Sequence, residues 1–547
     1  MLKNHPRGLT VLFFTEMWER FGFYLMLGIF LLYLTDTSTG GMGLSAARAA
    51  DILGTYLALV YLSPFLGGLL ADRVLGYRRA IYLGGILLSL GYFGLAASST
   101  MGMVWLSLLF IIFGNGFFKP NISTLVGKLY SDKRYIEHKD AGYNIFYMGI
   151  NIGAFVCNFV AAYLRNHFGW GYAFSAAGIG MALGVIWFFG GNKHVKDADV
   201  IKPATDQDLP LGKIFLTVFL PLFVFGAIGW FIPGNLTGSD STDAFIFASV
   251  PVAFFYLSLW WKASKEDKAP IAALLSIFAV VIIFWAIFHQ NASALTVWAE
   301  NYTDRALPAS VEPFAETFGM VQEVDTSPRP VPKIDAHGRT VTDAEGKAIT
   351  EMGPHIYFRN LPKDQWPPAG KSLKLLSTEI FQSINPFFVI ILTPLVVGVF
   401  NFLGRRNKEP STPGKIGLGL FITALSTLVM VGAVLASHNG LEKSSGMWLI
   451  TSYGVVTVGE LCLSPMGLSL VSKLSPPRLA ALMMGGWFVA TAFGNKLSGV
   501  LAGLWEMYDN KAVFFLINFA GAMLGALAIL LMLRWLKRVV LEHTGQS

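Results

Sequence analysis

Long apolar stretches follow one another along almost the whole chain, separated by short polar stretches. Each has about the 20 residues that a helix needs to cross a hydrocarbon core of about 30 Å, unlike the ten-residue alternation of a membrane barrel. The pattern predicts an all-α polytopic membrane protein with fourteen transmembrane helices. We place them near residues 11–34, 47–70, 80–98, 102–126, 141–164, 170–191, 212–233, 242–262, 270–299, 376–403, 413–437, 446–473, 480–503 and 512–535.

Lys and Arg gather in alternate loops. The basic segments are 71–79, 128–140, 261–268, 404–415 and 534–540, whereas the loops at 34–43, 98–100 and 233–243 contain neither residue. By the positive-inside rule, the N- and C-termini are cytoplasmic. The long polar stretch at about 300–375 then falls on the external side, where we expect a hydrated loop or lid.

Composition agrees with a membrane protein, since 54% of the residues are apolar and 14% are charged. The formal net charge of +7 comes from residues in particular loops, so it reflects topology and not binding to nucleic acid. Both cysteines, Cys157 and Cys462, lie inside apolar stretches, which argues against a disulfide framework. The sequence shows no metal-ligand cluster, phosphate loop or nucleophile–base set, so we expect neither a cofactor nor an enzyme.

The order of spans is six, then two, then six, which is typical of two similar bundles joined by an insert. We expect a first bundle in residues 1–195, a two-helix insert in 205–265 and a second bundle in 268–547. The loop "GGLLADRVLGYRRA" (67–80) resembles the signature loop of the major facilitator superfamily, and "GRRNK" (404–408) is its basic counterpart. This resemblance implies that superfamily's fold.

Three charged residues interrupt the first span, in "FFTEMWERFGFYLM" (13–26). Glu16, Glu19, Arg20 and Tyr24 follow at helical spacing and form one stripe. Burying a charge in a membrane costs a few kcal/mol, so the stripe must face a partner or an aqueous cavity. Glu16 can pair with Arg20 at i, i+4, which leaves Glu19 free for a proton or another partner. A structural ion-pair network is the alternative.

Further polar residues lie in other spans of the first half. Lys119 is too deep in its span to reach the interface easily, so it suits an anionic ligand group or an acidic partner such as Glu16 or Glu19. Asn151 lies on a polar stripe of the fifth span, which is also compatible with simple hydrogen bonding between helices. The first half thus supplies cationic groups.

The second half supplies an isolated carboxylate, Glu460, one turn before Ser464. Continuous helical spacing places His289 on a stripe with Trp285, Ser293 and Thr296. The other polar candidates of this half are Asn385, beside a proline, and Trp487.

A cavity between the halves would be bipolar. It would orient a zwitterion with its ammonium group toward Glu460 and its carboxylate toward Arg20 and Lys119. Aromatic residues Tyr24, Tyr61 and Trp487 could line its side-chain pockets. A buried carboxyl group can also exchange protons near neutral pH, which offers coupling to a proton gradient.

The sequence closely resembles the proton-dependent oligopeptide transporter family over nearly its whole length. The motifs are "ExxER" at 16–20, "FFKPN" (117–121), "FYMGINIGA" (146–154), "QSINP" (382–386) and "GELCLSPMG" (459–467). The resemblance implies import of di- and tripeptides with protons by alternating access. As for bacterial members, it implies a multi-pass protein of the inner (plasma) membrane, embedded in the lipid bilayer and functional as a monomer.

The resemblance also implies roles for individual residues. Arg20 and Lys119 face the peptide carboxylate, while Glu460 with Asn151 and Asn385 faces its amino terminus. Tyr24, Tyr61 and Trp487 line pockets, and Glu16 and Glu19 link proton binding to peptide binding.

One departure from the family pattern involves a pair of positions, one in the first span and one in the first span of the second bundle. Many members carry a second arginine on the stripe, paired with an acidic residue of the second bundle; here those positions are Leu27 and His289. The usual external gate is therefore changed. Either His289 takes over part of the proton role, or it stays neutral against Trp285 while Glu16, Glu19 and Glu460 suffice.

Other functions are compatible with parts of this pattern. A carrier of a small anion such as nitrate needs the cationic groups but gains little from Glu460. A channel needs no paired bundles with opposed charges, and a membrane-embedded enzyme needs a catalytic constellation.

Overall fold

The computed structural model describes residues 5–131, 134–200, 211–234, 236–335, 338–476 and 479–544. Twelve helices in this part of the chain are long and apolar enough to cross a membrane. Two further predicted spans correspond to the short apolar helix Phe215–Trp230 and to α16 (Ala480–Gly503). Together they account for the fourteen predicted spans.

The first bundle consists of α1 (Arg7–Thr35), α2 (Ala46–Leu70), α3 (Tyr77–Ala96), α4 (Met101–Leu129), α5 (Lys139–Phe168) and α6 (Trp170–Gly191). Several of the chain's helices begin at a Ser or Thr whose side chain accepts an N–H from the first turn, such as Ser45 before α2 and Thr100 before α4. Within the bundle, α1 packs on α5 and α6, while α3 packs on α4 and α6.

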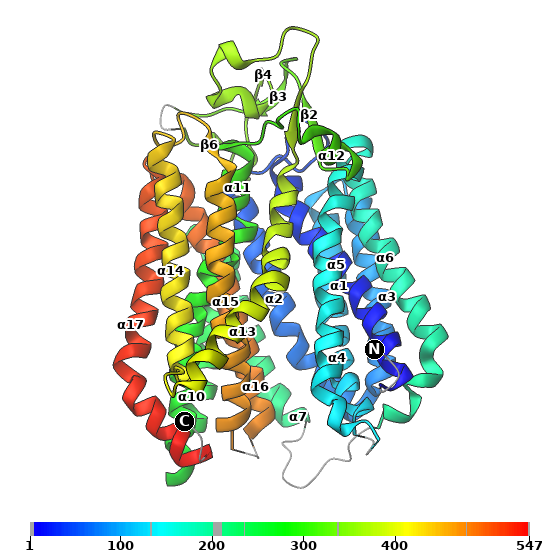
Figure 1. Ribbon diagram of the computed structural model, residues 1–547, viewed down its shortest axis with the longest axis vertical. Helices are drawn as coiled ribbons and strands as arrows, with labels where there is room; N and C mark the ends of the chain where they lie inside the picture. The colour runs from blue at the N-terminus through cyan, green and yellow to red at the C-terminus, as the bar shows by residue number, and fades with distance from the viewer. Residues whose placement is uncertain are drawn as a thin grey trace.

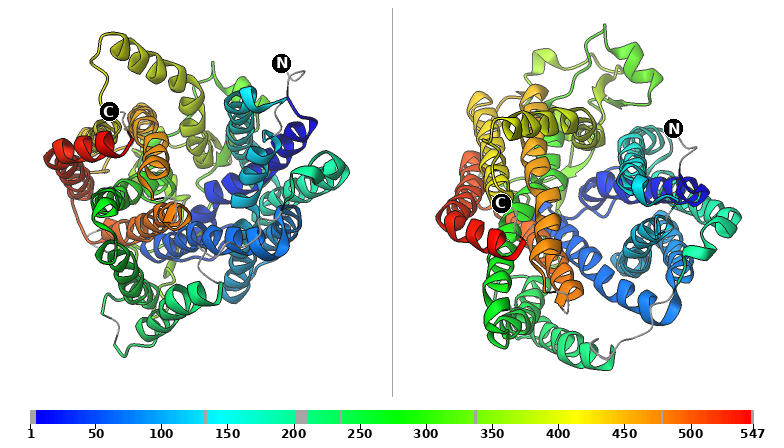
Figure 2. Two further views of the ribbon diagram at one scale, coloured as in Figure 1. Left: turned by 90° about the horizontal axis from the view of Figure 1, so that it is seen from below. Right: turned by 60° about the horizontal axis from the view of Figure 1, so that its bottom comes forward.

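The second bundle consists of α10 (Lys265–Phe288), α11 (Ala294–Asn301), α13 (Ile384–Arg405), α14 (Thr412–Ala436), α15 (Gly446–Leu474), α16 and α17 (Lys511–Thr544). Between the bundles in sequence come α7 (Leu211–Ile214), α8 (Leu220–Trp230) and α9 (Asp240–Trp261). Figure 2 shows the hairpin of α8 and α9 at the rim, where α9 contacts α2, α10 and α16. The predicted boundary at 195–205 falls partly on residues 201–210, which lie outside the described residues.

The bundles meet closely along α2 and α16. At their crossing, a Cβ added to Gly54 would lie 2.8 Å from the Cα of Gly499, so only a pair of glycines allows this approach. The buried ion pair of Asp51 and Lys496, at 2.5 Å, joins the same two helices. This crossing holds the bundles together on the side of the α1–α2 loop.

The long polar stretch is a folded unit and not simply a hydrated loop. We call residues 302–377 the external segment, after its predicted side; it lies at the top of Figure 1, and both termini lie toward the other end. It contains β1 (Thr303–Asp304), α12 (Glu312–Thr317), β2 (Val321–Val324), β3 (Arg329–Pro332), β4 (Thr350–Gly353) and β5 (Leu373–Leu376). Strand β2 pairs with β5 and β3 with β4, both antiparallel. Val324 of β2 and Leu375 of β5 form a small buried cluster with Tyr357 and Phe358.

The ninth predicted span is broken. Helix α10 ends at Phe288, a 3-10 turn covers His289–Ala292, and α11 follows, so Trp285, His289, Ser293 and Thr296 do not form the continuous helical stripe that was expected. The side chain of Gln382 stabilises the break, because its amide donates to Asn291 O and Thr296 Oγ1, both at 2.7 Å. A long-range contact therefore overrides the helical periodicity.

The α2–α16 crossing gives a stability prediction. We expect Gly54→Ala to lower the free energy of unfolding by about 1–3 kcal/mol, because the new methyl group overpacks the contact with Gly499. Thermal unfolding in detergent measures the change. The matched control is Gly398→Ala, in α13, where an added Cβ meets nothing within 4 Å; equal effects of the two substitutions would contradict the packing argument.

Candidate functional site

Arg20 lies between two carboxylates of its own helix. Its Nε is 3.3 Å from Glu16 Oε1, and its Nη2 donates to Glu19 Oε1 at 2.6 Å, with a further contact from Nε to Glu19. All three residues are at most 3% exposed. The predicted pair of Glu16 with Arg20 is confirmed, but the expectation that Glu19 is free is wrong.

The physical reason is the length of the arginine side chain. Adjacent residues point about 100° apart around a helix, but a guanidinium on four rotatable bonds can fold back to its neighbour, and a fully buried Glu19 requires a countercharge. Arg20 Nη2 also reaches Asn115 Oδ1 on α4 at 3.5 Å, and Asn115 donates to Val60 O on α2 at 2.9 Å. The cluster thereby links three helices.

Lys119 belongs to a chain of contacts that crosses between the bundles. Its Nζ lies 4.5 Å from the centre of the Tyr61 ring, and that ring meets the His289 ring edge-on at 6.2 Å. His289 is 8% exposed and packs on Trp285 at 5.3 Å, with Nδ1 at 3.1 Å from the Trp285 carbonyl. Glu16 and Glu19 also act electrostatically on Lys119.

Glu460 and Asn385 come together from α15 and α13. The Asn385 amide donates to Glu460 Oε2 at 3.0 Å and to Thr457 Oγ1 at 2.9 Å. A carboxylate and an amide, fixed to each other, thus lie on the second bundle.

Tyrosines lie between the two charged groups. Tyr24 and Tyr61 of the first bundle each interact electrostatically with both Arg20 and Glu460. Tyr147 of α5 also interacts electrostatically with both Arg20 and Glu460, and it is 61% exposed. Sequence reasoning did not select Tyr147; the available signal was its place one turn before Asn151 on the same helix. These tyrosines are therefore within electrostatic range of groups of opposite charge on the two bundles.

One candidate residue is less accessible than expected from a binding role, and another bonds within its own helix. Trp487 is 3% exposed and packs tightly on Gly467, where an added Cβ would lie 1.9 Å from the indole. Asn151 donates to Tyr147 O of its own helix at 3.0 Å. Trp487 is thus part of the packed core of the second bundle, whereas Asn151 stays partly exposed.

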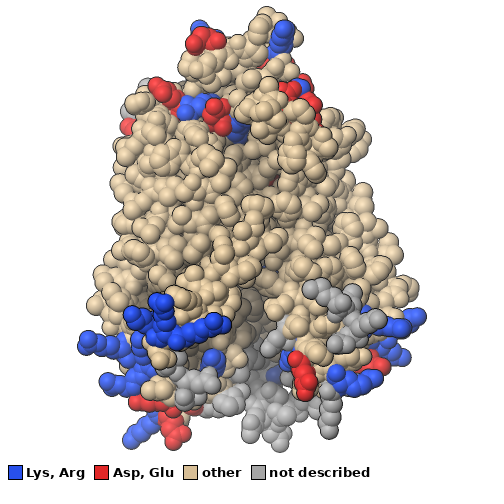
Figure 3. All heavy atoms as spheres, viewed as in Figure 1, with Lys and Arg blue, Asp and Glu red and all other residues tan. Residues whose placement is uncertain are grey.

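The space between the bundles opens toward one end. Figure 3 shows the surface hollowed between the two halves, on the side of the molecule where most of the visible Lys and Arg gather. A band with almost no charged residues lies above it, as a membrane requires.

The opposite end is closed by charged pairs between the bundles. Arg165 Nε of α5 lies 2.9 Å from Glu379 Oε1, at the start of the tenth span, and these side chains are 9% and 0% exposed. Asp51 and Lys496 form the second pair. Sequence reasoning missed both pairs, because each joins residues more than 200 positions apart.

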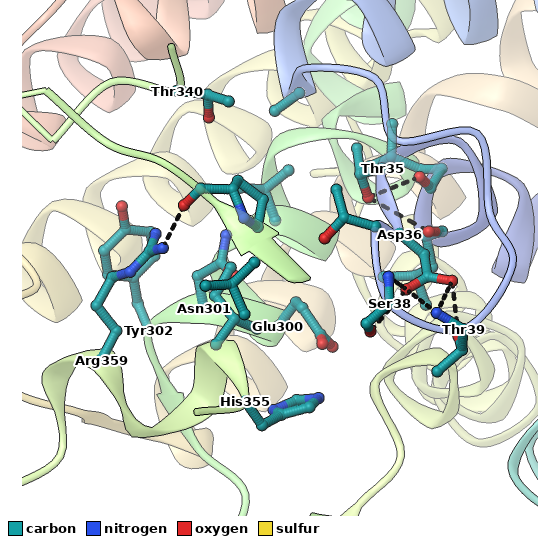
Figure 4. A pocket seen from close by; sticks show the side chains of 18 of the residues that line it. Thr35, Asp36, Ser38, Thr39, Glu300, Asn301, Tyr302, Thr340, His355 and Arg359 are labelled. Carbon is teal, nitrogen blue, oxygen red and sulfur yellow. Dashed lines mark hydrogen bonds between the residues drawn. The ribbon is translucent and has the colours of Figure 1, made fainter. Parts of the chain in front are cut away.

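A cavity of about 1250 Å³ lies beyond these pairs, beneath the external segment. Its walls come from the α1–α2 loop, from α5 and α11 and from the external segment. Figure 4 shows Glu300 and His355 pointing into the space opposite Asp36, while Arg359 turns aside to bond the carbonyl of Pro332 at 2.6 Å. Four hydrogen-bonding partners, among them Trp170, keep the pKa of Asp36 below its usual range despite its burial.

Among the described residues, no group of three or more His, Cys, Asp and Glu side chains could hold a metal ion. The polar groups of the central space are instead hydrogen-bonding and charged groups of the kind that hold an organic solute.

Comparison with known proteins identifies the family. The model of the POT family (PTR2) matches residues 78–321 and 372–518. The chain belongs to the POT family. It is 31% identical to the uncharacterized transporter YclF of Bacillus subtilis, over 96% of this chain and 94% of that protein. It is 30% identical to a di-/tripeptide transporter of Lactococcus lactis subsp. cremoris, over 99% of this chain and 97% of that protein.

Solved structures agree with this assignment to the POT family. A crystal structure of the peptide transporter POT in complex with sulfate superposes with a TM-score of 0.76 at 29% identity, covering 98% of this chain and 96% of that one. A POT family transporter in complex with 5-aminolevulinic acid has a TM-score of 0.76 at 25% identity, covering 98% of both chains. The fold is therefore that of the POT family within the major facilitator superfamily.

His355 gives a pH prediction for the external segment. Burial, together with nearby arginines, lowers the pKa of His355 to about 4, from a usual value of 6.5. Between these values the unfolded chain binds more protons than the folded one, so stability falls as the pH falls from 6.5 to 4. We expect this residue to contribute a loss of about 3 kcal/mol at pH 4.

The control for this prediction keeps the local hydrogen bond. His355 Nδ1 accepts the backbone N–H of Tyr357 at 3.2 Å, and His355→Asn supplies another acceptor that does not titrate. Melting temperatures at pH 7 and pH 4.5 should differ less for the variant than for the native protein. An unchanged difference would contradict the assignment.

Proposed function

We propose that this POT family protein is a proton-coupled symporter that imports di- and tripeptides by alternating access. One observation carries the proposal: the first bundle supplies cationic Arg20 and Lys119, the second supplies Glu460 held by Asn385, and Tyr24 and Tyr61 are in electrostatic range of both Arg20 and Glu460. A peptide is a zwitterion with the matching polarity. The name of the lactococcal relative, a di-/tripeptide transporter, supports this substrate, and the family as a whole supports a transporter and not an enzyme.

The peptide carboxylate binds toward Arg20 and Lys119, and the ammonium group toward Glu460. Asn385 holds the Glu460 carboxylate in place by the 3.0 Å hydrogen bond, and Asn151 lies on the facing helix α5. Tyr24 and Tyr61 line the space between the charges, where their rings accommodate side chains of many shapes. Trp487 supports this wall from the core of the second bundle.

Glu16, Glu19 and Glu460 carry the proton coupling, with Arg20 as the charge that responds to it. When either carboxylate beside Arg20 takes up a proton, the guanidinium loses a partner and becomes available to a peptide carboxylate. We propose that His289 stays neutral, because a second cation beside the Lys119–Tyr61 contact would be repelled.

Transport follows from rocking of the two bundles, residues 1–195 and 268–547, about the central space, with the insert of residues 205–265 at the rim. The structure then represents the inward-open state, since the hollow lies on the basic side that the positive-inside rule assigns to the cytoplasm. The protein functions as a monomer in the bacterial inner membrane, with both termini cytoplasmic.

The function is tested by uptake of a labelled dipeptide into proteoliposomes. We expect competition by unlabelled di- and tripeptides, and a neutral peptide carried with one proton should accumulate by up to about 50-fold per 100 mV of imposed potential. An N-acetylated dipeptide, which lacks the ammonium group, should compete poorly. Uptake that ignores both peptides and the proton gradient would refute the proposal, and competition by nitrate alone would indicate an anion carrier.

Charge removal at Glu460 separates binding from coupling. Glu460→Gln keeps an oxygen acceptor for Asn385 but cannot release a proton, so we expect gradient-driven accumulation to be lost while peptide exchange persists at higher substrate concentration.

His289→Gln should retain accumulation, because the neutral ring is only packed against Trp285 and Tyr61. The reverse result, with coupling lost only in His289→Gln, would move the proton site to the histidine.

A further inference from the structure

The external segment is anchored on the second bundle at both ends. It begins directly after α11 and leads into the 3-10 turn Thr378–Ser383 that starts the tenth span. Its strand β1 pairs with β6 (Ser444–Ser445), which precedes α15, and Arg305 Nη1 donates to Leu376 O at 2.8 Å across its base. The segment therefore moves with the second bundle.

Its far side is hydrogen-bonded to the first bundle at the α1–α2 loop. The N–H of Ala348 donates to Gly43 O at 2.8 Å, and the N–H of Ser45 donates to Gly346 O at 3.1 Å. These two bonds flank Leu44 and Lys347, which are antiparallel bridge partners. The hydroxyl of Thr37 adds a bond to Pro330 O at 3.0 Å.

A second attachment lies at the outer end of α5. The amide of Asn166 donates to Val321 O at 3.0 Å and to Ser377 Oγ at 2.7 Å. Gly319 packs directly on Tyr163, since an added Cβ would lie 2.8 Å from that side chain. The external segment thus spans from the second bundle to two separate places on the first bundle.

We propose that the external segment is a latch that must release the first bundle each time the transporter opens outward. This rests on the proposed function, because alternating access requires the outer ends of the bundles to separate. A segment tethered at both ends to one bundle cannot stay bonded to two places on the other bundle when they part. The backbone bonds at Gly43 and Ser45 and the amide bonds of Asn166 must therefore break.

The latch is additional to the contacts between the bundles themselves. It lies outside the Arg165–Glu379 pair and lines the 1250 Å³ cavity, so release of the latch also widens that cavity. Residues 322–371 fall in the gap between the two stretches that the POT family model matches. The latch lies largely in that gap.

A reversible cross-link tests the latch directly. Leu44 and Lys347 form the non-hydrogen-bonded type of antiparallel pair, whose Cα atoms lie about 4.5 Å apart, within reach of a disulfide. We expect the double variant Leu44→Cys, Lys347→Cys to transport dipeptide when reduced. Oxidation should lower uptake at least about tenfold, because a disulfide cannot open with the gate, and reduction should restore it.

The matched control places the same cross-link inside the external segment. Thr342 and Ala348 are bridge partners of the same type, and both belong to the segment. Oxidised Thr342→Cys, Ala348→Cys should transport as the reduced form does. If the Leu44–Lys347 cross-link forms and uptake is unchanged, the latch is refuted; absence of dipeptide uptake by the native protein would instead count against the proposed function.

A second variant weakens the latch without a covalent bond. Asn166→Leu removes two hydrogen bonds to the external segment at nearly constant size and should shift the bundle equilibrium toward the outward-open state by about tenfold. Distances between spin labels at Ser99 of the first bundle and Leu441 of the second measure this population. Thr317→Val, which removes only a bond to Pro313 O within α12, is the control; equal populations in the two variants would also refute the latch.

Discussion

The cost of a charge inside a membrane governs the interior of this protein. A charged side chain at the centre of a bilayer costs a few kcal/mol or more unless it has a partner. Arg20 meets this requirement with Glu16 and Glu19 on one helix, whereas Glu460 is held by Asn385 across two helices. The Arg20 and Glu460 side chains are therefore each held by hydrogen-bonding distances to a partner inside the membrane. The same constraint that keeps these groups paired makes them responsive to a proton or a zwitterion.

Closure at one end and a hollow at the other follow from where the bundles touch. Glycines at the α2–α16 crossing let two backbones approach, and Asp51 with Lys496 and Arg165 with Glu379 neutralise charge across the same face. Two rigid bundles that meet at one end diverge at the other. The hollow between the halves therefore lies on the basic side, which is the geometry expected of one state in alternating access.

Leu27 and His289 stand where many family members are expected to have an ion pair, and this changes which contacts close the bundles at the end opposite the hollow. Without an ion pair between these two positions, closure relies on pairs elsewhere and on the hydrogen bonds of the external segment. Backbone bonds at the α1–α2 loop do not depend on which side chains are present there. A unit that spans both bundles can therefore contribute to closure without a change in the central residues.

The sequence alone determined the membrane helices, through apolar stretches of membrane length, and predicted their orientation, through the distribution of Lys and Arg among the loops. These two features depend only on local composition. Motifs such as "ExxER" and "GELCLSPMG" were enough to predict the family. The pairing of Glu19 with Arg20, the break at His289 and the packing of Trp487 on Gly467 were decided by tertiary structure. So were the Arg165–Glu379 and Asp51–Lys496 pairs and the fold of the external segment. Helical periodicity says which residues share a face, but a buried charge chooses its partner from everything that the fold brings within a few ångströms.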